Sequence, residues 1–573
     1  MSGGIRLNYK LMNMTDSQRW EGRGCDLTQQ YQQTFADNYP LPAITDYVTG
    51  KTYTYGDMAR RIARIHLFFE AAGIRPGDKV ALLGKNTPLW IMIYMASLTY
   101  GSVIVPILND FNPTDAANIV DHSDATLLFV SDSIWEHISD REFPQIKAAV
   151  SLDSRKMLRC GDEKLTRYLK DLPRRFSRRY PGGFTRDDIV YRPRANDDVA
   201  IINYTSGTTG FSKGVMLSYD NVAGNVFFGI KTRLHYQGSR ALSFLPLAHA
   251  YGCAFDMLVP LSVGAHVTVL GKAPTPAVLV KAMAQVKPSL IICVPLILEK
   301  IYSKMIVPMI TKKPMRWILA VPMLDRAIYS RIRARLVETF GGAFEEIIIG
   351  GAPLNPEVED FLYRINFPFT VGYGMTECGP LISYTPCRQF IPGSAGRLLP
   401  VMEGKICADN TTDGQGEIVV RGQNVMLGYY KNPEATEAAL DSDGWLHTGD
   451  MGHIGGPLGR TIFIRGRYKT MILSANGQNI YPEEIEAKLN NMPYVSESLI
   501  VDRGGKLVAL IHPDDEDVGA ARLTDADVRT TMSQNLRELN KLVAPYEQVS
   551  DFEIMPEEFV KTPKRSIKRF MYK

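Results

Sequence analysis

The chain has 573 residues, of which 45% are apolar and 22% charged, which is the balance of an ordinary globular protein. Its length predicts roughly two to four domains. The formal net charge of +4 is small for this length, so no nucleic-acid partner is expected. The seven cysteines include no Cys-x-x-Cys pair, which argues against a zinc site or a disulfide framework and indicates a reducing compartment. The N-terminal residues lack the apolar segment of a signal peptide, and we expect a cytoplasmic location.

Residues 86–109 carry no charge and are long enough to span a bilayer. Gly101 and Pro106 interrupt this stretch. The breaks favour a buried helix over 89–100, a turn at Gly101 and a buried strand over 103–107. A transmembrane span is the alternative that this pattern disfavours.

Strand-like runs alternate with helical stretches along most of the chain, which predicts α/β layers with mainly parallel sheets. After about residue 397, short strands with Gly-Glu and Asp-Gly turns, such as 416–422, predict a small antiparallel β region. A mixed block of helix and strand follows from about residue 469 and has the size of a domain. The predicted strands of the first part are Val80–Leu83, Leu127–Val130, Val199–Ile202, Ala241–Phe244, His266–Leu270, Leu290–Val294 and Glu346–Ile349.

Residues 204–218 form the most informative segment of the chain. The glycines allow backbone N–H groups to face a ligand, the hydroxyls can donate to phosphate oxygens, and a lysine adds charge. The pattern fails the Walker A test, because Ser212 and Gly214 stand where a glycine and a hydroxyl residue are required. A flexible loop is the alternative, but the apolar run 200–202 before it indicates a buried strand. The candidate phosphate-binding residues are Thr205, Ser206, Gly207, Thr208, Thr209, Gly210 and Lys213.

Two further motifs follow strand-like runs. After 347–349 come Gly350, Gly351, Ala352 and Pro353, which permit close approach of a flat ligand at the carboxyl end of a strand; a tight turn without a ligand is the alternative. After 370–371 come Gly372, Tyr373, Gly374, Met375, Thr376 and Glu377. In this second motif the tyrosine ring can stack on a planar base, the threonine can donate to phosphate, and the carboxylate can bind Mg²⁺.

Two weaker signals remain. Asp450, in a Thr-Gly-Asp sequence, can accept hydrogen bonds from both hydroxyls of a ribose, and Arg467 can add a second contact to ribose or phosphate. His249 lies among apolar neighbours, for which a core histidine is the default interpretation. The residues after it, among them Gly252 and Phe255, are small or apolar.

The ordered motifs resemble those of the adenylate-forming superfamily, which includes acyl-CoA synthetases, adenylation domains of peptide synthetases and luciferases. The resemblance covers about residues 20–573. It implies a large N-terminal domain at 1–467, with two β-sheets flanked by helices and a small β-barrel part at about 385–467. It also implies a small, mobile α+β domain at 468–573.

The resemblance assigns roles to the motif residues. The loop at 205–213 would hold the β- and γ-phosphates of ATP, the 350–353 segment would border the adenine, and Asp450 with Arg467 would bind the ribose. Thr208 and Glu377 would bind Mg²⁺, with Thr376 and Glu377 among the catalytic residues. His249 would lie beside the substrate carboxylate and gate an acyl pocket that includes Gly252 and Phe255. Lys469 matches the family's interdomain hinge.

The C-terminal tail departs from the family pattern. Relatives carry a lysine that stabilises charge on the α-phosphate during adenylation. Ser566 stands at that position here, with Lys564 and Lys568 beside it. Either lysine is a candidate catalytic residue, and a solvated basic tail is the alternative.

The resemblance implies an acyl-CoA synthetase that uses ATP, Mg²⁺ and coenzyme A, with a medium- or long-chain fatty acid favoured as substrate. An acyl-carrier-protein synthetase and a non-catalytic lipid-binding protein are the alternatives.

Two regions are basic: 155–187, which includes Arg174, Arg175, Arg178 and Arg179, and 300–335, which has nine Lys/Arg against the single acid Asp325. For 300–335 a solvated helix face and a peripheral contact with an anionic membrane are both open. A homodimer is also compatible with the family.

Overall fold

The computed structural model describes residues 26–205, 212–310, 324–407, 414–457, 459–473, 479–562 and 567–572. By their contacts these residues form two compact units. The described residues up to Thr205, together with Ser212–Glu403 and Val420–Gly444, form the first unit. The described residues of Gly404–Val419 and of Trp445–Lys573 form the second. The boundary at 467/468 stays a prediction, because a grouping by contacts does not locate a hinge.

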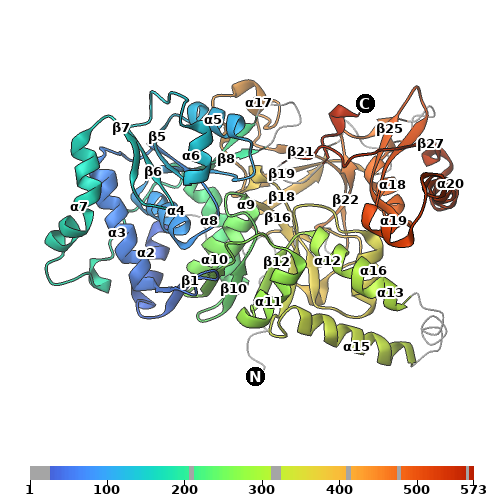
Figure 1. Ribbon diagram of the computed structural model, residues 1–573, viewed down its shortest axis with the longest axis horizontal. Helices are drawn as coiled ribbons and strands as arrows, with labels where there is room; N and C mark the ends of the chain where they lie inside the picture. The colour runs from blue at the N-terminus through green and yellow to red at the C-terminus, as the bar shows by residue number, and fades with distance from the viewer. Residues whose placement is uncertain are drawn as a thin grey trace. The chain divides into compact units, whose positions relative to one another are not determined.

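An eight-stranded sheet is the centre of the first unit (Figure 1). Its inner strands pair in parallel, whereas both edges carry antiparallel pairs. The parallel centre confirms the α/β prediction. In spatial order its strands are β20 (Gly428–Tyr429), β9 (Lys213–Ser218), β8 (Val199–Thr205), β4 (Val103–Ile107), β3 (Lys79–Leu83), β5 (Ala125–Val130), β6 (Ala148–Ser151) and β7 (Met157–Cys160).

The uncharged stretch 86–109 forms the predicted helix, turn and strand. Thr87 caps α4 (Pro88–Tyr100), and Gly101 ends it with a left-handed φ of 91°, which favours glycine. The strand β4 then enters the centre of the sheet with all its residues buried. Among the described residues, no helix combines the length and apolar character that crossing a membrane requires.

Two shorter sheets complete the α/β layers of the first unit. One contains, in order, β10 (Arg240–Ser243), β11 (His266–Val269), β1 (Pro42–Asp46) and β2 (Thr52–Thr54). The other contains β12 (Leu290–Cys293), β13 (Glu346–Ile349) and β14 (Phe369–Val371), which pair in parallel. They meet at their edges, where the Ser289 N–H donates to the Arg240 carbonyl at 2.8 Å.

Helices surround these sheets, and α3 packs against both α4 and α7. Apolar helix faces drive this packing: α3 buries Met58, Ile62, Phe68 and Phe69. The longer helices of the first unit are α2 (Leu27–Asp37), α3 (Tyr55–Ala71), α5 (Pro113–His122), α6 (Asp132–Ile138), α7 (Glu163–Arg179), α8 (Tyr219–Lys231), α11 (Pro276–Val286), α12 (Pro295–Ile301), α15 (Leu324–Thr339) and α16 (Pro356–Arg364). The shorter ones are α9 (Ala250–Gly252), α10 (Val259–Leu261), α13 (Val307–Ile310) and α17 (Pro433–Glu437), with π-helical turns η2 (Cys253–Leu258) and η3 (Tyr302–Ile306).

The sequence predicts antiparallel pairing after about residue 397, and the structure has it already from residue 373. In the first unit β15 (Tyr373–Gly374), β16 (Leu381–Tyr384) and β17 (Arg397–Leu398) pair in this way. In the second unit β21 (Leu446–Gly455) and β22 (Thr461–Arg467) form a long hairpin. The strands β18 (Met402–Ile406) and β19 (Gly416–Gly422) lie between these pairs in the sequence.

The second unit has its own core of helices packed on a sheet. The helices α18 (Pro482–Leu489) and α20 (Asp525–Leu542) cover the sheet β25 (Val495–Asp502), β26 (Leu507–Pro513) and β27 (Val549–Ile554) (Figure 1). Ile485, Leu489 and Met532 are fully buried in this core. The helix α19 (Asp515–Ala521) and the short strands β23 (Ile472–Leu473) and β24 (Asn479–Ile480) complete the unit. This block confirms the mixed helix and strand predicted after residue 469.

Candidate active site

The predicted phosphate loop connects two paired strands. Thr205 ends β8 and Lys213 begins β9, and the two residues face each other across the strand pair. Both ends of the loop are therefore fixed in the central sheet. The residues between them on which the phosphate prediction also rests, Ser206, Gly207, Thr208, Thr209 and Gly210, lie outside the described residues.

Lys213 and Glu377 come together on one tyrosine. The Lys213 Nζ lies 4.7 Å from the centre of the Tyr429 ring. The hydroxyl of the same tyrosine donates to Glu377 Oε1 at 2.9 Å. Burial and the adjacent Glu377 carboxylate raise the pKa of the Tyr429 phenol, which therefore stays protonated and keeps donating. Two motifs far apart in the sequence thus place a cation and a carboxylate in one neighbourhood.

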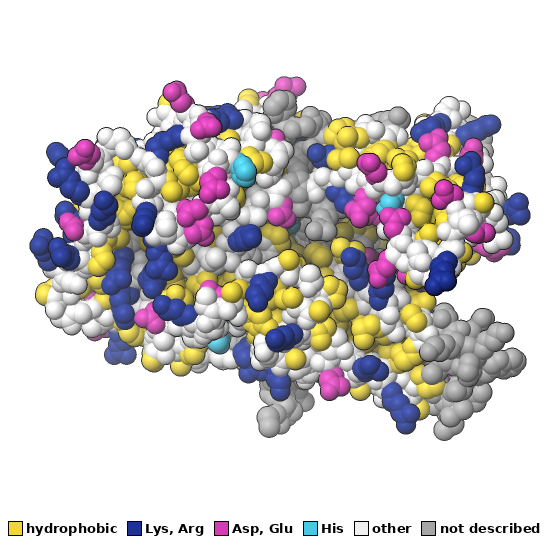
Figure 2. Space-filling view, viewed as in Figure 1, with side chains coloured by type: hydrophobic (Ala, Val, Ile, Leu, Met, Phe, Trp, Pro, Cys, Tyr) yellow, Lys and Arg dark blue, Asp and Glu magenta, His cyan; other side chains and the backbone are white. Residues whose placement is uncertain are grey.

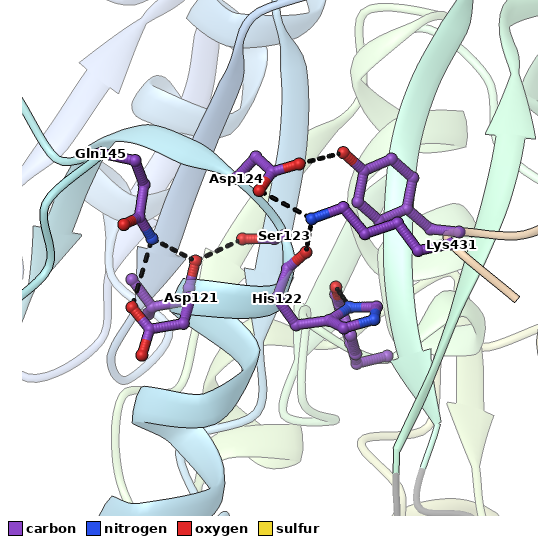
Figure 3. Close-up of polar contacts among 9 residues, drawn as sticks. Asp121, His122, Ser123, Asp124, Gln145 and Lys431 are labelled. Atoms are coloured by element: carbon purple, nitrogen blue, oxygen red, sulfur yellow. Dashed lines mark hydrogen bonds and ion pairs between the residues drawn. The ribbon is translucent and has the colours of Figure 1, made fainter.

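The turn between α5 and β5 supports the strands that flank the phosphate loop (Figure 3). His122 Nδ1 lies 2.7 Å from the hydroxyl of Tyr204, the residue before Thr205. Asp124 accepts from the Tyr430 hydroxyl and from Lys431 Nζ, both at 2.7 Å. The Tyr430 N–H in turn donates to the β9 backbone at 2.7 Å. These bonds hold both sides of the loop's base.

After β13 the chain becomes exposed from Gly351. The Tyr251 hydroxyl donates to the Ile348 carbonyl at 3.0 Å. A side chain at Gly350 would place its Cβ 3.1 Å from the Tyr251 ring, which is a tight contact, so the glycine eases the packing of this ring. Gly351 adopts a φ of +86°, and with Ala352 and Pro353 it is exposed. The strand end therefore presents an exposed backbone, which suits a flat ligand.

The segment from Gly372 to Glu377 packs closely against the following turn. The Gly372 N–H donates to the Ile349 carbonyl at 2.9 Å, and the Met375 N–H donates to the Pro380 carbonyl at 2.9 Å. At Gly374 a Cβ would come within 2.1 Å of that same Pro380 oxygen, so no other residue fits. Tyr373 and Thr376 are buried, whereas Glu377 is half-buried. Of these three side chains, only the carboxylate is partly accessible.

His249 begins the short helix α9 and is half-buried. Its Nδ1 accepts from the Tyr251 N–H at 3.3 Å, so the helix fixes the ring. Gly252 and Phe255, which we expected in an acyl pocket, are buried. A Cβ at Gly252 would lie 2.7 Å from the Pro246 carbonyl oxygen, so this glycine is needed for packing.

Sequence reasoning missed Asp256, a carboxyl buried inside the π-helical turn next to Phe255. Burial raises its pKa well above the usual range, while backbone hydrogen bonds from Leu245 and Phe244 act in the opposite direction. These bonds tie the turn to the segment that carries His249. Tyr429 was missed as well, because a tyrosine in a short strand has no local signal that its hydroxyl reaches a distant carboxylate.

In the second unit, Asp450 and Arg467 are direct neighbours. They are cross-strand partners of the β21–β22 hairpin, and Arg467 Nε lies 3.1 Å from Asp450 Oδ1. The Asp450 side chain is 6% exposed and that of Arg467 is 63% exposed. The Asp450 N–H donates to the Thr448 hydroxyl oxygen at 3.1 Å, so a hydrogen bond within the Thr-Gly-Asp sequence fixes its conformation. The pair offers an acceptor and a donor side by side.

The other candidates of the second unit are three lysines. Lys469 is exposed in the turn after β22. Lys568 is half-buried, and its N–H donates to the Val560 carbonyl at 2.8 Å. Lys564, the alternative lysine, lies outside the described residues together with Ser566. The assignment of a catalytic lysine in the tail stays a prediction.

The family model of the AMP-binding enzymes matches residues 32–430. The chain belongs to this family. The match covers all the motifs of the first unit, from the phosphate loop through Glu377 to Tyr429. It confirms the resemblance inferred from the motifs.

Curated relatives of this family member include ligases for different acids. It is 27% identical over 498 residues to the long-chain-fatty-acid–CoA ligase ACSBG1 of Rattus norvegicus, covering 80% of this chain and 66% of that ligase. The peroxisomal long chain acyl-CoA synthetase 7 of Arabidopsis thaliana is 30% identical, over 81% of this chain and 69% of that protein. A probable 4-coumarate–CoA ligase of Dictyostelium discoideum is 27% identical, over 80% of this chain and 79% of that protein. The chain spans about two thirds of the length of the first of these.

Solved structures share the fold over nearly the whole chain. ATP-bound MatB from Rhodopseudomonas palustris superposes with a TM-score of 0.73 at 22% identity, covering 96% of this chain and 98% of its own. The anthranilate CoA ligase AuaEII, solved with anthranoyl-AMP, gives 0.73 at 17% identity, over 97% and 98% of the two chains. At these identities the likeness shows the fold alone.

Proposed function

We propose that this AMP-binding enzyme joins a fatty acid, of medium or long chain, to coenzyme A at the expense of ATP. In the first step the carboxylate attacks the α-phosphorus of ATP, forming acyl-AMP as pyrophosphate leaves. In the second step the thiol of coenzyme A attacks the acyl carbonyl, and AMP leaves. A carboxylate needs this activation because it is a poor electrophile, and no covalent bond to the enzyme is required.

The observation that carries the proposal is the meeting of Lys213, Tyr429 and Glu377. The lysine stands at the base of the phosphate loop, where its charge would stabilise the leaving phosphates. The carboxylate is half-buried and accepts a hydrogen bond from a phenol that carries no charge. The second oxygen of this carboxylate would be the one offered to a cation.

Glu377 fits a magnesium ion that shares its oxygen ligands with a substrate. In the described residues no group of three or more metal-ligating side chains gathers, so an ion with several protein ligands is not supported there. Mg²⁺ is commonly bound by one or two carboxylates plus substrate phosphates, and there it neutralises developing phosphate charge. Tyr429 would hold the Glu377 carboxylate in place for this ion, with Thr208 as the second expected ligand.

The fatty-acid assignment rests on the long-chain ligases among the relatives and on the apolar residues around His249. Phe255, Met257 and Leu258 are buried beside the half-buried histidine. Apolar side chains around a binding site favour a substrate with an apolar acyl group over a polar acid. Because one relative is named as a 4-coumarate ligase, an aromatic acid is the alternative substrate with which fatty acids should be compared.

Pyrophosphate release tests the proposal. The purified protein is given ATP, Mg²⁺ and one acid at a time, from acetate to stearate and including 4-coumarate, with and without coenzyme A. We expect release with fatty acids of medium or long chain, and thioester only when coenzyme A is present. Release with 4-coumarate alone would overturn the substrate class, and no release with any acid would support a non-catalytic lipid-binding protein.

The acceptor thiol is tested in the same assay. An acyl carrier protein replaces coenzyme A as the source of the thiol. Thioester formation with the carrier protein but not with coenzyme A would identify an acyl-carrier-protein synthetase. We also propose that the basic segment 300–335 contacts anionic membranes, where a long-chain acid would partition. Part of that segment, 311–323, lies outside the described residues.

A further inference from the structure

A basic pocket lies at the start of α3, apart from the residues assigned to catalysis. It has a volume of about 160 Å³ and is lined by Lys51, by the strand β2 and by the first half of the helix. Its lining includes four cationic side chains, Lys51, Arg60, Arg61 and Arg64, and one carboxylate, Asp57. We call these residues, with Tyr53, the α3 pocket.

An aromatic ring organises two of these cations. Lys51 Nζ lies 5.1 Å and Arg61 Cζ 5.0 Å from the centre of the Tyr53 ring. Each cation is therefore held near the ring face by a cation–π interaction rather than by an anion. Arg60 lies 3.4 Å from Asp57, the single acid of the pocket. The pocket therefore contains four positive side chains and a single negative one.

The third arginine shows that the charge of the pocket is not balanced. The Arg64 Nε is buried and has no hydrogen-bond partner within the described residues. Burial, and then repulsion from Arg61 and Arg60, lowers the pKa of Arg64. A buried guanidinium N–H without an acceptor costs free energy. An anion in the pocket would relieve the repulsion among the cations.

The helix α7 extends the positive surface from the pocket. The Arg64 guanidinium lies over the Phe176 ring of α7, with 4.7 Å between Cζ and the ring centre. Beyond this contact α7 exposes Arg174, Arg175, Arg178 and Arg179. Figure 2 shows Lys and Arg side chains gathered at the left of the view, where Figure 1 places α3 and α7. The pocket is therefore the recessed part of a wider cationic face.

We propose that the α3 pocket binds a phosphate group, carried either by the headgroup of an anionic lipid or by a free phosphate compound. Several guanidinium groups that converge on a small recess provide the multiple N–H donors that phosphate oxygens accept. The surrounding α7 arginines would attract the same anion from a distance. The proposal goes beyond the ligase function and does not rest on it, because none of these residues belongs to the candidate active site.

The test compares two double variants with the same change of charge. Lys51→Glu with Arg61→Glu alters the pocket, while Lys281→Glu with Lys506→Glu alters exposed lysines elsewhere. Binding is measured to phosphatidylcholine vesicles with and without phosphatidic acid, and to inorganic phosphate by calorimetry, at constant ionic strength. A charge near an anionic surface contributes about fivefold in affinity, so the pocket variant should lose more than about tenfold and the control far less.

Each outcome decides the proposal. Loss of vesicle binding in the pocket variant, with competition by inorganic phosphate, identifies a lipid headgroup as the source. Phosphate binding that the pocket variant loses, without any vesicle binding, identifies a free phosphate compound. Equal losses in both variants, or no binding by the unaltered protein, would overturn the site. Pyrophosphate release should be the same in the unaltered protein and in both double variants. If the charge reversal prevents the pocket variant from folding, Lys51→Gln with Arg61→Gln replaces it.

Discussion

The two compact units hold their candidate site residues in different ways. In the first unit Lys213 and Glu377 come from distant segments and meet on the ring of Tyr429, which is 8% exposed. In the second unit Asp450 and Arg467 face each other directly across one hairpin, and the arginine is largely exposed. The first arrangement depends on tertiary packing, and the second on strand register alone.

This difference predicts different sensitivity to mutation. A charge that packing fixes in advance costs little reorganisation when charge develops on a substrate, so its loss is felt in the reaction step. An exposed side chain keeps much of its conformational freedom, and its ion pair contributes little free energy. We therefore expect its removal to have a small effect, and on substrate binding rather than on the reaction step. Kinetic measurements on one residue from each unit separate these two cases.

The largest effect is expected from Glu377→Gln. The amide oxygen still accepts from the Tyr429 hydroxyl, so the change removes the negative charge and leaves the hydrogen bond. Removing one electrostatic group from an active site costs about 10²–10³-fold in kcat, and we expect the upper end. The measurement is the rate of pyrophosphate release at saturating ATP and acid.

A matched variant controls for the loss of one surface carboxylate. Glu437→Gln makes the same chemical change at an exposed position of α17 and should leave kcat within about twofold. Raising the Mg²⁺ concentration should partly restore the rate of Glu377→Gln if the residue binds that ion. A rate of Glu377→Gln close to that of the unaltered protein would show that the Lys213–Tyr429–Glu377 arrangement is not the reaction site.

The two units should also respond to pH in opposite directions, which is the second largest effect. In the first unit burial lowers the pKa of His66 and of His235 from 6.5 to about 4. Between pH 4.5 and 6.5 the unfolded chain then binds more protons than the folded chain. Stability from these histidines therefore falls as the solution is acidified through this range, by about 2 kcal/mol for each.

In the second unit burial raises the pKa of Glu486 from 4.5 to about 7, although the neighbouring Arg569 acts in the opposite direction. Here the folded chain binds the extra proton, so this contribution to stability is present at acid pH and is lost as the pH rises towards 7. Hydrogen exchange at pH 5 and pH 7, corrected for intrinsic rates, should show α3 less protected and α18 more protected at pH 5. His66→Gln should reduce the change in protection of α3 between pH 5 and pH 7, and Glu486→Gln should reduce that of α18. If protection changed in the same direction in both units, the opposite pH responses proposed for these residues would be wrong.

Several local elements were predictable from sequence, because most of the motifs follow or end a strand of recognisable pattern. The run Ile347–Ile349 indicates a buried strand, and the structure has it. The helix, turn and strand within 86–109 were predicted with boundaries that differ by one residue at the helix start. Local patterns of burial and glycine conformation are sufficient for such elements.

Contacts between distant segments were not predictable in the same way. Nothing around Tyr429 indicates that its hydroxyl reaches Glu377, since that contact needs β20 to pair with β9 at the sheet edge. Asp256 gave no signal either, because its neighbours read as an ordinary apolar run. The four cations of the α3 pocket are spread over a turn and a helix, and the ring of Tyr53 that holds two of them, Lys51 and Arg61, becomes evident only in three dimensions.

The smallest effect is expected from Arg467→Gln in the second unit. Its ion pair with Asp450 joins a buried carboxylate to a side chain that is 63% exposed, and such pairs contribute about 0–1 kcal/mol. If the pair binds a ribose, the KM for ATP should rise about two- to threefold while kcat stays unchanged. Asp450→Asn is the informative comparison, because Asp450 is 4% exposed and is the acceptor that two ribose hydroxyls would need. A larger rise in KM for Asp450→Asn than for Arg467→Gln supports a ribose contact made by the carboxylate, whereas equal changes would mean that only their mutual pairing matters.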